Sequence, residues 1–195
     1  MPKNVLVLLA EGFEEVEAVT PVDYLRRAAI EVTTAALGSE LAVTGSRGIR
    51  VFADASLEDL FLGGKLEPEA WDAVVVPGGA GGADNIAASK RAGDFLKAMA
   101  AAGRIVAAIC ASPARVLAPL GLLAGKGFTC YPGEELKVPP SAGAVWKEDR
   151  VVVDGNLITS RGAGTAGEFA AALIGALLGG EEAATLAGKV LLYTP

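Results

Sequence analysis

The chain has 195 residues, of which 52% are apolar and 21% are charged, and its net charge at pH 7 is −6. The length and composition are typical of one compact α/β domain over residues 1–195 and argue against disorder. An acidic balance without a cluster of Lys and Arg argues against a nucleic-acid partner. The chain contains no histidine, which excludes a Ser-His-Asp triad, a Cys-His pair and histidine-liganded zinc within one chain; we expect no metal and no cofactor.

The N-terminal segment does not have the pattern of a targeting signal. Its apolar run, residues 5–10, is shorter than the core of a signal peptide, and four glutamates follow it within the next seven residues. No run approaches the length of a transmembrane helix. Two cysteines without C-x-x-C spacing indicate free thiols in a reducing compartment. We therefore expect a cytoplasmic protein without a membrane partner.

Short apolar runs alternate with helical patterns along the chain. The first half predicts a strand at 4–10, a helix at 14–29 kinked by Pro21, a strand at 30–37, a hairpin over 41–57 that turns at Gly45 and Gly48, and a strand at 71–77. The second half predicts a helix at 89–102, a strand at 104–110, a helix at 112–120, a strand at 126–129, two or three short strands over 144–160, and a closing helix at 165–180. Wholly apolar strands alternating with helices indicate an α/β fold with a mostly parallel sheet covered on both faces.

Functional sites in such sheets form at the carboxyl ends of strands, where Cys110 is found. A residue between a strand and a helix resembles a nucleophile elbow, and Ser112-Pro113 is typical of a helix start. A helix N-terminus would favour the thiolate and lower the pKa of the thiol without a histidine. The alternative is an inert core cysteine, and spacing alone weighs the two equally.

Two neighbouring loops supply partners for this cysteine. The first predicted strand is followed by Glu14, Glu15 and Glu17. Most of these glutamates are expected to lie in a solvated acidic first turn of the next helix. One of the carboxylates can instead point toward Cys110 and act as a general base. The PGGAGG segment, 77–82, is either a tight turn or a source of backbone N–H groups for an oxyanion, together with the amide after Cys110.

The remaining motifs are weaker signals. Residues 162–167 fit G-x-G-x-x-G, but the acids that follow open a predicted helix instead of ending a second strand, so a nucleotide site is the minority interpretation. Cys130 ends a predicted strand and suits core or supporting packing. Arg47 at the hairpin tip is either a solvated charge or a group for an interface or a small anion.

Several segments in register resemble the ThiJ/PfpI superfamily, in the branch of the Parkinsonism-associated deglycase and its bacterial homologues. They run from LLAEGFEEVEAVTPVDYLRRA through SRGIRVFADASLEDL, WDAVVVPGGAGGADN, VAAICASP and TCYP to LITSRGAGTAGEFA. The resemblance implies a flavodoxin-like three-layer sandwich and a homodimer.

The resemblance also implies roles for individual residues. Cys110 matches the reactive, easily oxidised cysteine, and Glu17 the glutamate that hydrogen-bonds its sulfur. The amides of Gly79 and Ala111 match an oxyanion pocket, and Arg47 an arginine that reaches the partner's site. Pocket positions are expected at Gly78, Ser160, Arg161 and Ala163, with Cys130, Glu14 and Glu15 in support.

Two departures from the family pattern bear on activity. Ala111 stands where the protease-like branch has a histidine, which disfavours proteolysis. Tyr131 stands where this branch often has a histidine, so Tyr131 would have to replace it as a proton shuttle. We expect a cofactor-independent glyoxalase III or deglycase acting on methylglyoxal, glyoxal or early glycation adducts. The alternatives are a redox-sensing stress protein or chaperone that uses an oxidisable Cys110, and a noncatalytic small-molecule binder.

Overall fold

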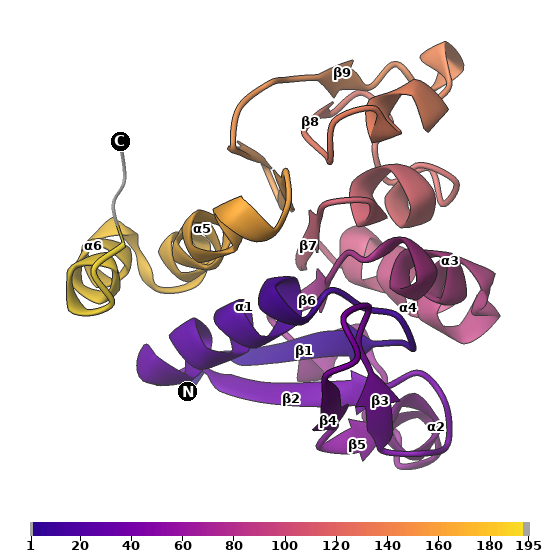
Figure 1. Ribbon diagram of the computed structural model, residues 1–195, viewed down its shortest axis with the longest axis vertical. Coiled ribbons are helices and arrows are strands. Elements are labelled where there is room, and N and C mark those ends of the chain that lie inside the picture. The colour runs from indigo at the N-terminus through magenta and orange to yellow at the C-terminus, as the bar shows by residue number, and fades with distance from the viewer. Residues whose placement is uncertain (1, 193–195) are drawn as a thin grey trace.

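The computed structural model describes residues 2–192 and is built around a seven-stranded sheet in the order β10-β11-β7-β6-β1-β2-β5 (Figure 1). Every neighbouring pair is parallel except β10 with β11. The predicted mostly parallel sheet is therefore confirmed. Its strands are β1 (Asn4–Leu9), β2 (Glu31–Ala36), β5 (Ala55–Ser56), β6 (Ala73–Val76), β7 (Ile105–Ile109), β10 (Val151–Asp154) and β11 (Leu157–Ser160).

Two small strand pairs lie outside this sheet. The predicted hairpin consists of β3 (Ala42–Thr44) and β4 (Arg50–Phe52), which pair antiparallel. Its tip is closed where predicted, since the Gly45 N–H donates to the Ile49 carbonyl and the Gly48 N–H donates to the Gly45 carbonyl. The second pair, β8 (Gly127–Phe128) and β9 (Val145–Trp146), is parallel.

Helices cover both faces of the sheet. Residues of α1 (Glu15–Arg27), α5 (Ala166–Leu178) and α6 (Gly180–Lys189) share one apolar cluster, and those of α2 (Leu57–Leu62), α3 (Ala80–Ala88) and α4 (Lys90–Ala101) share the other. Short helical turns are η1 (Pro68–Ala70), η2 (Pro113–Leu117), η3 (Glu134–Lys137), η4 (Pro140–Ala142) and η5 (Ala163–Thr165). Within residues 2–192, every helix is too short or too polar to cross a membrane.

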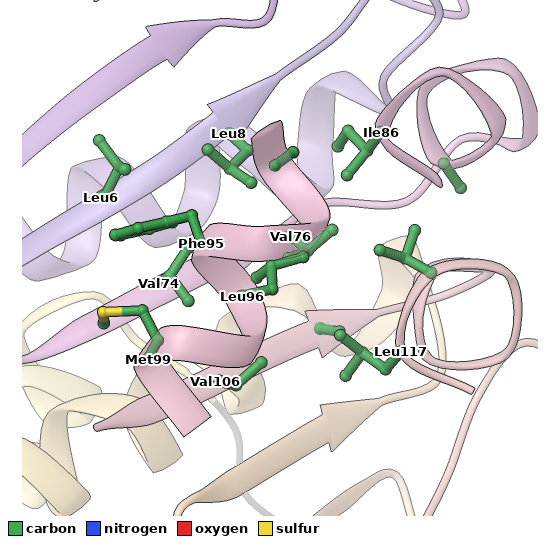
Figure 2. Packing of buried hydrophobic residues seen from close by; sticks show 14 of the residues in the cluster. Leu6, Leu8, Val74, Val76, Ile86, Phe95, Leu96, Met99, Val106 and Leu117 are labelled. Carbon is green, nitrogen blue, oxygen red and sulfur yellow. The ribbon is translucent and has the colours of Figure 1, made fainter. Parts of the chain in front are cut away.

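The strands are apolar throughout because both of their faces are buried. In β1, Leu6 and Leu8 belong to the cluster under α4, whereas Val5 and Val7 belong to the cluster under α1 and α5. Figure 2 shows the first cluster, in which Phe95, Leu96 and Met99 of α4 pack over β1 and β6. This packing fixes the strand ends that carry the site.

The helix predicted around Pro21 is α1, which runs from Glu15 to Arg27 with Pro21 inside it. Two local features differ from the sequence-based expectations. The helix expected at 112–120 is one π-helical turn, because Pro119 has no N–H to donate and cannot extend a regular helix. The glycine-rich segment 77–82 enters α3 at Ala80, and the sequence patterns did not predict this helix.

Candidate functional site

Cys110 directly follows β7 and occupies a strained backbone conformation, with φ at 64°. A residue other than glycine in this left-handed region costs about 1–3 kcal/mol. Hydrogen bonds on both sides hold it there: its N–H donates to the Ser160 carbonyl at 2.9 Å, and its carbonyl accepts from the Tyr131 N–H at 2.8 Å. The chain therefore makes the sharp strand-to-helix turn that the sequence predicts, and the turn is braced by two other segments.

Glu17 of α1 is the carboxylate that meets this sulfur. Its side chain is buried, and one oxygen, Oε2, accepts the Gly78 N–H at 2.9 Å. The carboxyl group also hydrogen-bonds the Cys110 thiol. A Cβ on Gly78 would lie 2.3 Å from Glu17 Oε2 and 2.4 Å from the Cβ of Cys110, so only glycine fits between the two side chains.

Burial shifts both groups toward their neutral forms. It raises the pKa of Glu17 from 4.5 to about 7, although hydrogen bonds from Cys110 and Gly78 act in the opposite direction. Burial also raises the pKa of the Cys110 thiol to about 12, and the negative charge of Glu17 adds to this. The expectation of a lowered thiol pKa is therefore wrong: desolvation and the nearby carboxylate outweigh the favourable amides at the turn.

The two groups consequently titrate as a pair, with apparent pKa values of about 7 and about 12. Between these values the pair holds a single proton, which lies mainly on Cys110 because the thiol has the higher pKa. When that proton is on Glu17, the repulsion of the carboxylate is absent, and the N–H groups of Gly79 and Ala111 favour the thiolate. The structure thus places both predicted amides at the sulfur.

The thiol opens into a cavity of about 440 Å³. Eight of the residues singled out from the sequence line it: Glu14, Glu17, Arg47, Gly79, Cys110, Ala111, Tyr131 and Ala163. Four further residues complete the wall: Ser46, Ala80, Gly81 and Glu134. A site of this volume accommodates a small organic substrate.

The three glutamates after β1 have separate positions. Glu17 is at the sulfur, and Glu14 lies at the cavity wall, where its Oε2 accepts the Ser46 hydroxyl at 2.6 Å. Glu15 is buried against the hairpin tip, where its Oε1 accepts the N–H groups of Arg47 at 2.8 Å and Ile49 at 3.2 Å. Burial works to raise the pKa of Glu15, but these hydrogen bonds outweigh it and lower the pKa below its usual value.

This attachment sets the position of Arg47. Its Nε lies 3.8 Å from Glu14 Oε2, and the side chain is largely exposed. Arg47 lines the cavity of its own chain. The contact between Glu15 and the hairpin tip requires glycine at position 45, because a Cβ there would lie 2.3 Å from the carboxyl group of Glu15.

Several expected pocket residues lie outside the cavity. Gly78 is behind it and contributes its backbone N–H to Glu17. Ser160 is fully buried, and its hydroxyl bonds the Arg150 carbonyl and the Thr165 hydroxyl. Arg161 faces a neighbouring hollow. Cys130 is buried with its sulfur 4.0 Å from Glu135 Oε2, which agrees with a packing role.

The sequence reasoning missed Glu134 and the arginine that holds it. Arg115 of η2 donates to Glu134 Oε2 at 2.9 Å and to Oε1 at 2.8 Å, and its third nitrogen bonds both carboxylate oxygens of Asp84 in α3. Hydrogen bonding to Arg115 lowers the pKa of Glu134 to about 2. No sequence pattern marks pairs separated by 19 and 31 residues. In the described part of the chain, no cluster of three His, Cys, Asp or Glu side chains is arranged to hold a metal ion.

Comparison with known proteins gives a consistent result. A model of the DJ-1/PfpI family matches residues 3–176. Protein dj-1beta of Drosophila melanogaster is 41% identical over 98% of each chain. Protein DJ-1 homolog B of Arabidopsis thaliana is 42% identical over 97% of this chain, which spans 41% of that protein's length. A deglycase of Pyrococcus abyssi is 34% identical over 81% of this chain and 89% of its own.

Solved structures agree with the sequence relatives. The crystal structure of Drosophila melanogaster DJ-1beta superposes with a TM-score of 0.89 at 40% identity and covers 100% of both chains. Oxidized Toxoplasma gondii DJ-1 superposes with a TM-score of 0.90 at 38% identity, covering 98% of this chain and 100% of its own. The flavodoxin-like fold is thereby confirmed, and the chain belongs to the DJ-1/PfpI family.

Proposed function

We propose that the protein is a cofactor-independent enzyme of the glyoxalase III or deglycase type, acting on methylglyoxal, glyoxal or their early glycation adducts. The observation that carries the proposal is the strained Cys110, whose sulfur meets a proton-sharing carboxyl group and two N–H groups at the wall of a cavity. The relative from Pyrococcus abyssi that is named a deglycase is in agreement.

The proposed reaction starts when the Cys110 proton moves to Glu17, which leaves the charge on the sulfur. The thiolate attacks the aldehyde carbon of methylglyoxal, an S–C bond forms, and the carbonyl oxygen takes the electron pair. The N–H groups of Gly79 and Ala111, which favour the thiolate in the free protein, stabilise this oxygen. Glu17 donates its proton to the oxygen, which gives a hemithioacetal and leaves a carboxylate.

Glu17 then acts as a base. Its carboxylate removes the hydrogen from the carbon bonded to sulfur and returns it to the neighbouring carbonyl carbon, while the hydroxyl proton moves to the second oxygen. The product is a thioester of lactate on Cys110. Water cleaves the thioester to lactate and the free thiol, so the net reaction adds one water to methylglyoxal and needs no external oxidant.

Two other cavity residues have proposed supporting roles. The Tyr131 ring lies at the cavity wall, half exposed, where its hydroxyl can relay a proton in place of the family's histidine. The Arg47 guanidinium faces the same space and can hold the second carbonyl oxygen.

The test is turnover of methylglyoxal to lactate by wild type, Cys110→Ala and Glu17→Gln. We expect no lactate from the Cys110 variant and a loss of roughly 10²-fold or more from the glutamate variant, because a positioned acid–base group contributes that much. Equal turnover by wild type and Cys110→Ala would refute the proposal.

A second candidate is a redox-sensing stress protein or chaperone. The observation that favours it is that Cys110 is partly accessible, whereas Cys130 is buried, and that a protonated Glu17 lies in place to bond an oxidised sulfur. Mass spectrometry after mild peroxide should find oxygen added to Cys110 first. Equal oxidation of Cys110 and Cys130 would argue against this role.

We also propose that the protein is a cytoplasmic homodimer. Apolar side chains are exposed along one face of α1 and the adjoining hairpin: Val16, Val19, Ile49 and Phe52. Phe52 is 77% exposed in the single chain, which is unfavourable in water. A second copy that covers this face would bury these side chains beside the hairpin tip that carries Arg47.

A further inference from the structure

A second hollow of about 410 Å³ adjoins the cavity at Cys110. Tyr131 and Ala163 line both spaces, so they form the boundary between them. The other residues of this side lobe are Pro132, Arg150, Arg161, Gly162, Gly164 and Thr165. A ligand bound at Cys110 that extends past Tyr131 and Ala163 would therefore enter this side lobe.

The side lobe is cationic because the strand register brings two arginines together. The β10–β11 pairing aligns Val151 with Ser160, so Arg150 and Arg161 lie at the same end of these strands. The Arg161 N–H donates to the Arg150 carbonyl at 3.3 Å. Both side chains reach the lobe from this position.

The charges of the two arginines are used differently. Arg150 donates to both carboxylate oxygens of Glu168, at 3.0 and 2.8 Å, and to the Gly164 carbonyl at 2.7 Å. Arg161 has one partner, the Glu148 carbonyl at 2.9 Å, and no carboxylate of residues 2–192 lies within ion-pair distance of it. A guanidinium has five N–H donors, so Arg161 keeps its charge and unused donors.

A further wall of the lobe is formed by residues 162–165 of the G-x-G-x-x-G segment. These residues carry no charge, and the two glycines have no side chain that would fill the lobe. The Thr165 hydroxyl is already bonded to the Gly162 carbonyl at 2.8 Å and to Ser160 at 2.7 Å. The turn therefore does not compete with a ligand for Arg161.

We propose that the side lobe binds the anionic group of a substrate whose dicarbonyl-derived end lies at Cys110, with Arg161 as the residue that contacts the anion. The inference rests on the proposed function and narrows it to one substrate class: thiol or amine adducts of a dicarbonyl that carry a carboxylate or a phosphate. Both anions match the flat fork of a guanidinium.

Binding of stable adduct analogues tests the proposal without turnover. S-acetonyl-N-acetylcysteine carries a carboxylate, and its amide is a neutral match of nearly the same shape. S-acetonyl-4′-phosphopantetheine and S-acetonylpantetheine form the corresponding phosphate pair. Calorimetry would measure the four dissociation constants for wild type, Arg161→Gln and Lys97→Gln. Lys97→Gln is the control, because Lys97 is an exposed lysine on α4 and its loss removes one positive charge away from the side lobe.

We expect at least one anionic analogue to bind wild type roughly tenfold more tightly than its neutral match, as a charge-assisted pair would give. For each pair of analogues, the dissociation constant of the neutral compound is divided by that of the anionic compound. The pair with the larger ratio shows whether the site prefers a carboxylate or a phosphate. The ratio should fall to about one in Arg161→Gln and persist in Lys97→Gln. Ratios near one for both pairs in wild type, or an unchanged ratio in Arg161→Gln, would overturn the proposal.

The same proteins separate this inference from the proposed function. If the ratio depends on Arg161 but wild type produces no lactate from methylglyoxal, the side lobe is an anion site and the enzymatic proposal fails. If lactate production requires Cys110 but the ratio is near one, the enzymatic proposal is supported and the side lobe is not an anion site.

Discussion

Replacing Glu17 with glutamine should change how the stability of the protein depends on pH. The folded protein holds the Glu17 pKa at about 7, against 4.5 for an ordinary glutamate. Between these values the native state binds a proton that the unfolded state has released, so stability falls as pH rises. At about 1.4 kcal/mol per pH unit, the destabilisation reaches about 3 kcal/mol above pH 7.

Glutamine is neutral at every pH and can still accept the Gly78 N–H, so Glu17→Gln removes this penalty. Urea unfolding of both proteins at half-unit steps from pH 4.5 to 8 measures the difference in unfolding free energy. Relative to wild type, the variant should gain about 3 kcal/mol of stability across that range. Taking the difference cancels the titrating groups that do not interact with Glu17.

Glu15→Gln is the matched control, because Glu15 is also a buried glutamate of α1 but has a lowered pKa. Its ionised form stabilises the native state above pH 4.5, and that contribution is lost as pH falls through the folded pKa. The Glu15→Gln difference should therefore stay flat from pH 5 to 8. A flat profile for Glu17→Gln, or one that falls with pH, would refute the raised pKa of Glu17.

Four further predictions use the same geometry. Iodoacetamide labelling of Cys110 should rise through pH 7 and level off by pH 9, as the pair titration requires; a single midpoint near that of a free thiol, about 8.5, would contradict it. Gly78→Ala should cost about 1–3 kcal/mol in urea unfolding and abolish lactate formation, because its Cβ collides with Glu17; normal activity would show that the pair tolerates displacement. Tyr131→Phe should lower kcat for methylglyoxal by about 10²-fold if the hydroxyl relays a proton, and an unchanged kcat removes that role. Val19→Arg should convert the proposed dimer to a monomer in light scattering, and an unchanged mass would place the interface elsewhere.

Local pattern was enough to predict much of the framework. Runs such as Val74 to Val76 read as strands because an apolar segment bounded by turn residues has few other ways to be buried. The hairpin tip and the position of Cys110 at a strand end followed for the same reason. Two of the segments that escaped prediction are α3 and the single turn η2. They lack such a signal, because in glycine-rich and proline-bounded stretches the tertiary contacts decide the backbone conformation.

The site was only partly predictable. Glu17 was selected through the family resemblance, since spacing alone left three glutamates equivalent. Register and packing separate them: Glu15 is held by the hairpin tip, and Glu17 is held by Gly78. The direction of the Cys110 pKa was predicted wrongly, because a sequence shows the helix start that favours a thiolate but not the burial and the carboxylate that oppose it.

The sequence by itself determined the sheet strands, the reactive turn and the missing histidine, because these depend on residue type and short-range spacing. Only the tertiary structure decided which distant side chains meet. The Arg115–Glu134 pair, the side lobe at Arg161 and the meeting of Glu17 with Cys110 each join segments that are far apart in the chain. Such contacts depend on strand order and register, and their energies depend on how much water the fold removes.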